Sequence, residues 1–188
     1  MYEFTAFEPM EINMRMQMMC AIALGCAVMA TTSNLQAQGT DQDKQFIMTA
    51  SQSDLTEITL SNLALTKSSN AQVKSYAQEM ITDHNKLEAE MKPFADQLGV
   101  PPATALNAEH QQLLDQLQGL SGADFDKQYM SDMDTSHHAT LDAFKTELST
   151  TTNTQMKPTV AKGEKVVAKH TAMADKLSKK LGGTVSGM

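Results

Sequence analysis

Apolar residues recur at alternating intervals of three and four through most of residues 43–181. The clearest stripe runs through Val73, Ala77, Met80, His84, Leu87, Met91, Phe94 and Leu98. This spacing places the side chains on one face of a helix, where they can pack against partner helices. The alternating β-branched runs that are typical of strands are missing. The sequence therefore predicts an all-α fold.

Turn and capping residues divide this pattern into separate helices. The sequence predicts four long helices over 43–67, 71–98, 123–149 and 155–181, and an extra short helix over 103–118 before the third long one. Asp41 or Asp43 can cap the first helix and Asn70 the second, whereas Pro93 should kink the second. Because the connections are short, we expect neighbouring helices to be antiparallel, as in a four-helix bundle.

The N-terminal part of the chain has the pattern of an export signal. Arg15 precedes an almost unbroken apolar run over 18–30, and polar residues follow up to Ala37. This order is typical of a secretory signal peptide, and the run is too short to span a bilayer. We expect translation to start at Met14, since the residues before it are acidic. Residues 1–37 are then an extension and signal peptide, 38–183 an exported, periplasmic helical domain without a transmembrane helix, and 184–188 a flexible tail.

Both cysteines, Cys20 and Cys26, lie in this signal segment. Residues 23–26 loosely match a bacterial lipoprotein cleavage box, so Cys26 is an alternative processing site that would carry a lipid anchor at the outer membrane. The other interpretation is that both cysteines are small apolar residues of the signal core. If cleavage falls near Ala37, no cysteine remains, which excludes a disulfide, a thiolate metal site and a cysteine nucleophile.

The charge pattern argues against a nucleic-acid partner. The formal net charge is −7 at pH 7, and the lysines gather in residues 157–180. A nucleic-acid interface needs a basic stripe with arginine and stacking aromatic side chains, but the chain has no Trp and 3 Tyr. We therefore interpret the lysine-rich segment as one basic helix in an acidic bundle.

Each of the four apolar stripes carries one polar residue near its middle. These residues are Glu57, His84, His137 and His170. At a rise of about 1.5 Å per residue, Glu57 and His84 differ in height by about 3 Å, and the other two match to about one turn. The four side chains are therefore expected to meet inside the bundle.

Three interpretations of this group stay open. Three imidazoles and a carboxylate suit one divalent transition metal, such as zinc, copper or iron, and Asp83 and Asp134 could then hold the ligands by hydrogen bonds. Alternatively, the four side chains form a hydrogen-bonded network that only fixes packing, since buried polar groups must be paired. A different small polar ligand is a third possibility.

A second group could bind copper. Met130, Met133 and His138, beside His137, would offer thioether and imidazole ligands, which suit cuprous copper. The two methionines fall on the core stripe, however, where methionine ordinarily fills space, and this interpretation is favoured. We expect His138 to point to a solvated flank, and His110, on the short helix, to be a surface or packing residue.

The order of these residues is similar to that of a known family. The resemblance is carried by Phe46 and by residues 54–58, 63–64, 73–77, 80–84, 120–122, 125–126, 129, 137, 141, 144, 170, 174 and 177. Together they resemble a bacterial family of ferritin-like, predicted periplasmic or outer-membrane proteins of unknown function. The resemblance implies a ferritin-like antiparallel four-helix bundle with an extra short helix and an export signal, and it implies little about activity.

The chain departs from the di-iron proteins that share the ferritin-like fold. Their sites use Glu-x-x-His from two helices, but here Ile81, Asp134 and Val167 stand three residues before the histidines. Too few carboxylates therefore reach the centre for a conventional ferroxidase. No nucleophile–base pair or phosphate loop is present either, which favours a protein that is not an enzyme. The alternative to metal binding is a structural envelope or stress protein that contacts a protein partner.

Overall fold

A computed structural model describes residues 39–183 as a set of five α-helices without strands. The helices are α1 (Asp41–Lys67), α2 (Ala71–Leu98), α3 (Ala108–Gly119), α4 (Gly122–Thr150) and α5 (Lys157–Lys180). The predicted all-α class is thereby confirmed. The predicted signal peptide with Met14 and Cys26, and the predicted tail over 184–188, lie outside the described residues.

Local capping explains the start of α1 and both ends of α2. Thr40 and Asp43 form a capping box at the start of α1, so the cap is Thr40 and not one of the predicted aspartates. Asn70 caps α2 as predicted, and Gly99 ends it in the left-handed conformation with a φ of 69°. Pro93 lies inside α2, which continues through it to Leu98.

The short helix α3 begins five residues later than predicted. Its cap is Asn107, whose side chain accepts a hydrogen bond from the backbone N–H of His110. Residues 100–107 instead form an extended link after Pro101 and Pro102. The sequence predicts the helix directly after the prolines, but Asn107 is the stronger start signal, because its side chain caps the free backbone N–H of His110.

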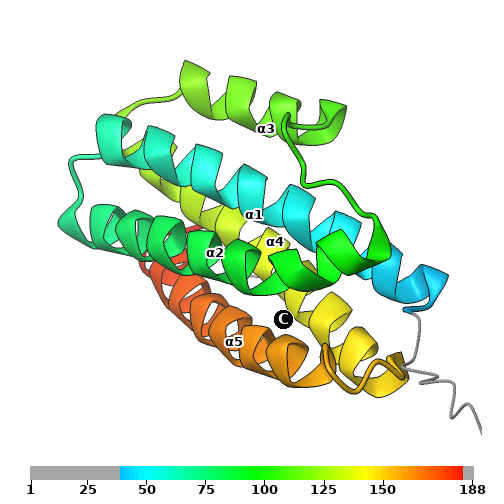
Figure 1. Ribbon diagram of the computed structural model, residues 1–188. Coiled ribbons are helices and arrows are strands. Elements are labelled where there is room, and N and C mark those ends of the chain that lie inside the picture. The colour runs from blue at the N-terminus through cyan, green and yellow to red at the C-terminus, as the bar shows by residue number, and fades with distance from the viewer. Residues whose placement is uncertain (1–38, 184–188) are drawn as a thin grey trace, which may run out of the picture. The chain divides into compact units, whose positions relative to one another are not determined.

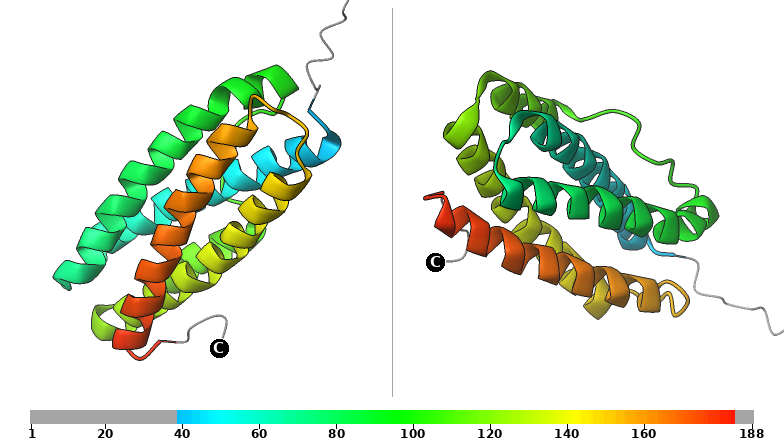
Figure 2. Two further views of the ribbon diagram at one scale, coloured as in Figure 1. Left: turned by 90° about the horizontal axis from the view of Figure 1, so that it is seen from below. Right: turned by 90° about the vertical axis from the view of Figure 1, so that its left-hand side faces the viewer.

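The four long helices pack side by side, as the views in Figures 1 and 2 show. Contacts join α1 to α2, α2 to α5, α5 to α4, and α4 back to α1. The short helix α3 lies outside this ring and contacts α1 and α4. Every long helix therefore has two long neighbours and turns one face toward the common interior.

The interior has two apolar halves. One half contains Leu60, Ala64, Val73, Tyr76, Ala77, Met80, Leu117, Phe125, Tyr129, Met130, Met133 and Ala174. The other contains Phe46, Ile47, Ala50, Leu87, Met91, Val100, Phe144, Met156, Val160 and Val167. On each long helix, the polar residue of the apolar stripe falls between members of the two halves. The bundle thus has a polar layer between two apolar layers.

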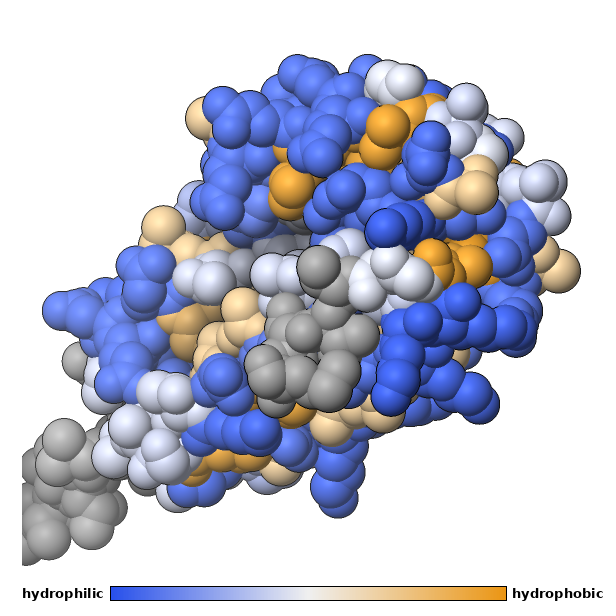
Figure 3. Space-filling model, turned by 180° about the vertical axis from the view of Figure 1, so that it is seen from behind, coloured by the Kyte–Doolittle hydropathy of each residue, from blue (hydrophilic) through white to orange (hydrophobic). Residues whose placement is uncertain are grey.

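The outer surface is mostly polar. The face in Figure 3 is largely hydrophilic, with hydrophobic side chains in separate small areas. Among the described large hydrophobic residues, Met48 is the exposed one, at 52%. Within residues 39–183, no helix combines the length and the apolar character that a membrane span requires.

A close approach between α4 and α5 makes Gly163 sensitive to substitution. A Cβ atom on Gly163 would overlap Phe144 Cε1 and lie 3.1 Å from Cζ, while the Phe144 ring is held edge-on by Phe46 at 4.9 Å between centroids. We expect Gly163→Ala to lower the free energy of unfolding by about 1 kcal/mol, because overpacking outweighs the better helix propensity of alanine. Urea unfolding measures this change.

Gly119 provides the matched control for this substitution. It also lies in a helix, but a Cβ atom there would meet nothing within 4 Å. Gly119→Ala should therefore be neutral or slightly stabilising. If both variants were at least as stable as the wild type, the contact between α4 and α5 would not be as tight as described.

Candidate metal centre

The three histidines of the apolar stripes and Glu57 lie together in the polar layer. The ring centroids of His84, His137 and His170 are 5.3–5.7 Å apart. Glu57 Oε2 is 2.6 Å from His84 Nε2 and 3.3 Å from His137 Nε2. All four side chains are at most 1% exposed. The structure therefore brings together the four residues that the stripes singled out, one from each long helix.

One atom of each side chain has no hydrogen bond. These atoms are Glu57 Oε2, His84 Nε2, His137 Nε2 and His170 Nδ1. His84 Nε2 and Glu57 Oε2 nevertheless lie within ion-pair distance of each other, at 2.6 Å. A ligand nitrogen of each histidine lies within 4.8 Å of the other two, and Glu57 Oε2 lies beside His84 and His137. Buried polar atoms without hydrogen bonds are rare in proteins and call for an explanation, such as a bound ion.

The outer nitrogen of each histidine, in contrast, is held by an acceptor. His84 Nδ1 donates to Asp54 Oδ1 at 2.8 Å, and His170 Nε2 donates to Asp83 Oδ2 at 3.0 Å. His137 Nδ1 donates to the backbone carbonyl of Met133 at 2.8 Å. These bonds fix the ring orientations and place the proton of each neutral imidazole on its outer nitrogen. The inner nitrogens of neutral His137 and His170 then carry lone pairs, as metal ligands require.

Glu57 is oriented in the same manner. Its Oε1 accepts hydrogen bonds from Ser53 Oγ at 3.2 Å and Ser136 Oγ at 3.3 Å. The serines come from the same turn of α1 and from the facing helix α4. Because both hydroxyl groups bind Oε1, the carboxylate turns Oε2 toward the histidines.

The charges in the centre are unequal. Burial raises the pKa of Glu57, but its electrostatic interactions with the His137 and His84 rings, which are stronger when these rings are protonated, outweigh burial and lower the pKa to about 2. Burial lowers the pKa of His84, but the charge of Glu57 and the hydrogen bond to Asp54 raise it to about 10. Without a metal, a Glu57 carboxylate therefore faces a His84 imidazolium at neutral pH.

The other two histidines are neutral at neutral pH. Burial lowers the pKa of His137. Burial also lowers the pKa of His170, to about 4, although the hydrogen bond to Asp83 acts in the opposite direction. Two of the three imidazoles are thus already in the protonation state that binds a metal.

Asp54 belongs to the centre, although the sequence analysis did not include it among the site residues. It lies three residues before Glu57 on α1 and therefore one turn away, which was the available signal. Burial raises its pKa to about 6. The aspartate lies beside the apolar stripe, in the contact between α1 and α2, so the periodicity of the stripe does not identify it.

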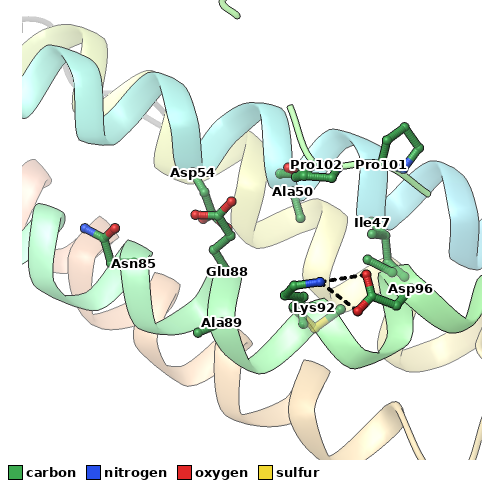
Figure 4. Close-up of a pocket in the computed structure, with 13 residues that line it drawn as sticks. Ile47, Ala50, Asp54, Asn85, Glu88, Ala89, Lys92, Asp96, Pro101 and Pro102 are labelled. Carbon is green, nitrogen blue, oxygen red and sulfur yellow. Dashed lines mark hydrogen bonds and ion pairs between the residues drawn. The ribbon is translucent and has the colours of Figure 1, made fainter. Parts of the chain in front are cut away.

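Asp54 also forms the polar end of a pocket of about 310 Å³ between α1, α2 and the prolines after α2. Ile47, Ala50 and Met91 provide much of its apolar wall. Figure 4 shows the carboxylates of Asp54 and Glu88 side by side at one end, and the Lys92–Asp96 ion pair at the other. The histidine centre is therefore linked to this pocket through Asp54.

The remaining predicted site residues lie elsewhere. Met130 and Met133 are buried in one apolar half of the core, and the copper group that they would form with His138 stays a prediction. Asp134 is buried and lies beside His138, with Oδ1 at 3.9 Å from Nε2. His110 packs α3 against α1, with Nδ1 2.7 Å from Thr56 Oγ1.

These observations define an all-helical bundle with a buried centre of one glutamate and three histidines. The chain belongs to the family described as domain of unknown function DUF4142, whose model matches residues 28–177. No curated protein matches the chain. It is similar to the crystal structure of a DUF305 fragment from Deinococcus radiodurans, with a TM-score of 0.62 and 18% identity over 77% of this chain and 97% of that one. At this identity the likeness concerns the fold.

Proposed function

We propose that the protein binds one divalent transition-metal ion through Glu57, His84, His137 and His170. The observation that carries this proposal is that ligand nitrogens of the three histidines lie within 4.8 Å of one another, with Glu57 Oε2 beside those of His84 and His137, while an acceptor binds the outer nitrogen of each ring. Three imidazole nitrogens and one carboxylate oxygen suit zinc or copper, and iron is also compatible. Four protein ligands complete a tetrahedral site, so the centre is better suited to holding an ion than to catalysis.

The proposal includes the setting of this centre. We infer a ferritin-like arrangement of the four long helices. It is supported by the ring in which each long helix contacts two others, and by the polar layer at mid-height of the bundle. We also infer export to the periplasm, supported by the signal pattern of residues 14–37, with a lipid anchor at Cys26 as the alternative. The intact mass of the exported protein distinguishes free from lipid-anchored forms.

A structural role is the second candidate function. The 2.6 Å approach of Glu57 to His84 favours it, because a charged pair can compensate its own burial without an ion. In that case the polar layer only fixes the packing of the helices, and the protein acts through contacts to an envelope partner. The two functions differ in whether the purified protein carries metal.

Metal analysis of the exported protein tests the proposal. The protein should be purified from the periplasm without a metal-binding tag and analysed by mass spectrometry of its metals. We expect His84→Ala to lack an equivalent of metal that the wild type contains. His110→Ala, which changes a histidine outside the centre, should retain it. Equal metal content in all three proteins would contradict the proposal. Metal-free wild type together with an unstable His84→Ala variant would favour the structural role.

The hydrogen bond from His84 to Asp54 should tune the metal affinity. Asp54→Asn keeps the shape of the side chain but weakens the acceptor at His84 Nδ1. We expect the affinity to fall by about tenfold or more, as is usual when a carboxylate partner of a histidine ligand is lost. Competition with a chelator of known affinity measures this change.

Glu88→Gln is the matched control for Asp54→Asn. It removes a carboxylate from the same pocket, next to Asp54, and Glu88 is not a ligand of the centre. The metal affinity of the Glu88→Gln variant should stay within a factor of about two to three of the wild type. Glu88 affects the metal only through the electric field of a partly solvated charge. Equal losses in both variants would mean that net charge, and not the bond to His84, sets the affinity.

A further inference from the structure

A second group of metal-binding side chains lies between α4 and α5. Asp134 and His138 are four residues apart on α4, so they share one face of that helix. Asp175 reaches them from α5, with Oδ1 at 2.9 Å from His138 Nε2. Asp134 Oδ1 is 3.9 Å from the same nitrogen, and the carboxylates of the two aspartates lie close to each other. One potential ligand atom from each residue lies within 4.8 Å of the other two.

The spacing of these atoms is close to that of a coordinated ion. Zinc binds imidazole nitrogen and carboxylate oxygen at about 2.0–2.2 Å, so tetrahedral ligand atoms lie about 3.4 Å apart. The distances of 2.9 Å and 3.9 Å from His138 Nε2 bracket this separation. Small side-chain rotations would therefore bring all three atoms onto one ion.

Burial makes the group partly preorganised and still accessible. Asp134 is fully buried, whereas the side chains of His138 and Asp175 are 34% and 40% exposed. The buried aspartate provides a fixed ligand, and the half-exposed pair leaves room for an ion to enter and for water to complete its coordination. Three protein ligands with an open position are a common arrangement for zinc.

The two carboxylates of the group favour a divalent cation. Two neighbouring carboxylates repel each other when both are ionised. A divalent cation between them would neutralise both. An imidazole that contacts both acids adds a nitrogen ligand, which favours a transition metal over magnesium or calcium.

This group is separate from the central histidines. His137 and His138 are consecutive residues of α4, but His137 is buried in the polar layer and His138 points toward α5. We infer that Asp134, His138 and Asp175 form a second site for a divalent transition-metal ion such as Zn²⁺. The inference is independent of the proposed function, because it uses none of the central ligands.

Zinc titration of the exported protein, freed of metal, tests this inference. Isothermal titration calorimetry should resolve a second, weaker zinc equivalent in the wild type, since two of the three ligands are exposed and must be ordered. We expect Asp175→Asn and His138→Gln each to lose this equivalent. Asp142→Asn is the matched control, because Asp142 also lies on α4 but is 80% exposed and pairs with Lys145.

The results separate this inference from the proposed function. Loss of the weaker equivalent in Asp175→Asn and His138→Gln, but not in Asp142→Asn, supports the second site. Any other pattern among these three variants overturns it and leaves the group as a surface ion pair. His84→Ala reports on the central site in the same titration, so either proposed site can be contradicted without affecting the other. Thermal unfolding of every variant confirms that the loss does not come from unfolding.

Discussion

Replacing Glu57 with glutamine is expected to lower the free energy of unfolding of the metal-free protein by about 3 kcal/mol. Glu57 is buried, and its Oε2 lies 2.6 Å from His84 Nε2. Glutamine keeps the volume of the side chain but removes its charge, so the His84 imidazolium loses its main compensating partner. An uncompensated buried charge is among the most destabilising changes a core can undergo. Urea unfolding at pH 7 in the presence of a chelator measures the effect.

The double variant Glu57→Gln/His84→Gln is the control for this prediction. It removes both charges, so no unpaired charge remains in the core. We expect it to be more stable than Glu57→Gln alone, with a coupling energy of about 1–3 kcal/mol between the two positions. A Glu57→Gln variant as stable as the wild type, or a double variant no better than the single one, would show that His84 is uncharged in the metal-free centre.

The stability of the metal-free protein should also fall as the pH rises from about 7 to 10. The pKa of His84 is raised from 6.5 to about 10 in the folded protein, by the charge of Glu57 and the hydrogen bond to Asp54, against the effect of burial. A raised pKa means that the folded state binds the proton more tightly than the unfolded state. The stabilisation is complete below pH 6.5 and is lost as the pH passes through 10. The expected loss is on the order of 2 kcal/mol or more.

Thermal unfolding between pH 6 and pH 10, with a chelator present, measures this loss. Glu57→Gln is the informative comparison, because removal of the carboxylate lowers the pKa of His84. In that variant the decline should therefore begin at a lower pH. A wild-type stability that stays constant from pH 7 to 10 would contradict the charged state of His84.

Metal binding should respond to pH in the opposite direction. An ion can coordinate His84 Nε2 only after its proton has left, whereas His137 and His170 have lowered pKa values and are already neutral. Binding at pH 7 should therefore release about one proton per ion, and the affinity should rise with pH. Calorimetry in two buffers of different ionisation enthalpy counts the released proton.

The sequence predicted the helices and the central residues because both depend on periodicity. The bounds of α2 agree with the prediction, since Asn70 and Gly99 are strong local end signals. His84 and its three partners could be aligned because each helix rises by a fixed length per residue. The start of α3 was placed too early, since helix propensity alone does not show where a loop ends.

The hydrogen-bond partners of the centre were harder to predict. Asp83 was expected to hold a histidine, and it accepts from His170. Asp54 and Ser136 were missed because their contacts depend on which helices are neighbours and how each is rotated. That Asp134 holds a ligand of the centre stays a prediction; its side chain also lies near His138 and Asp175, and the contact with Asp175 depends on the position of α5. Sequence spacing gives the face of a helix, and only the packing gives the partner.

The origin of the four central residues on four separate helices has a consequence for motion. An ion held by all of them would crosslink segments that are otherwise joined only by side-chain packing and short loops. No long helix could then detach alone without breaking a coordinate bond, so partial opening would be confined to the helix ends and to α3. Amide hydrogens at mid-height of all four long helices would accordingly exchange with solvent at one common, slow rate in the metal-bound protein.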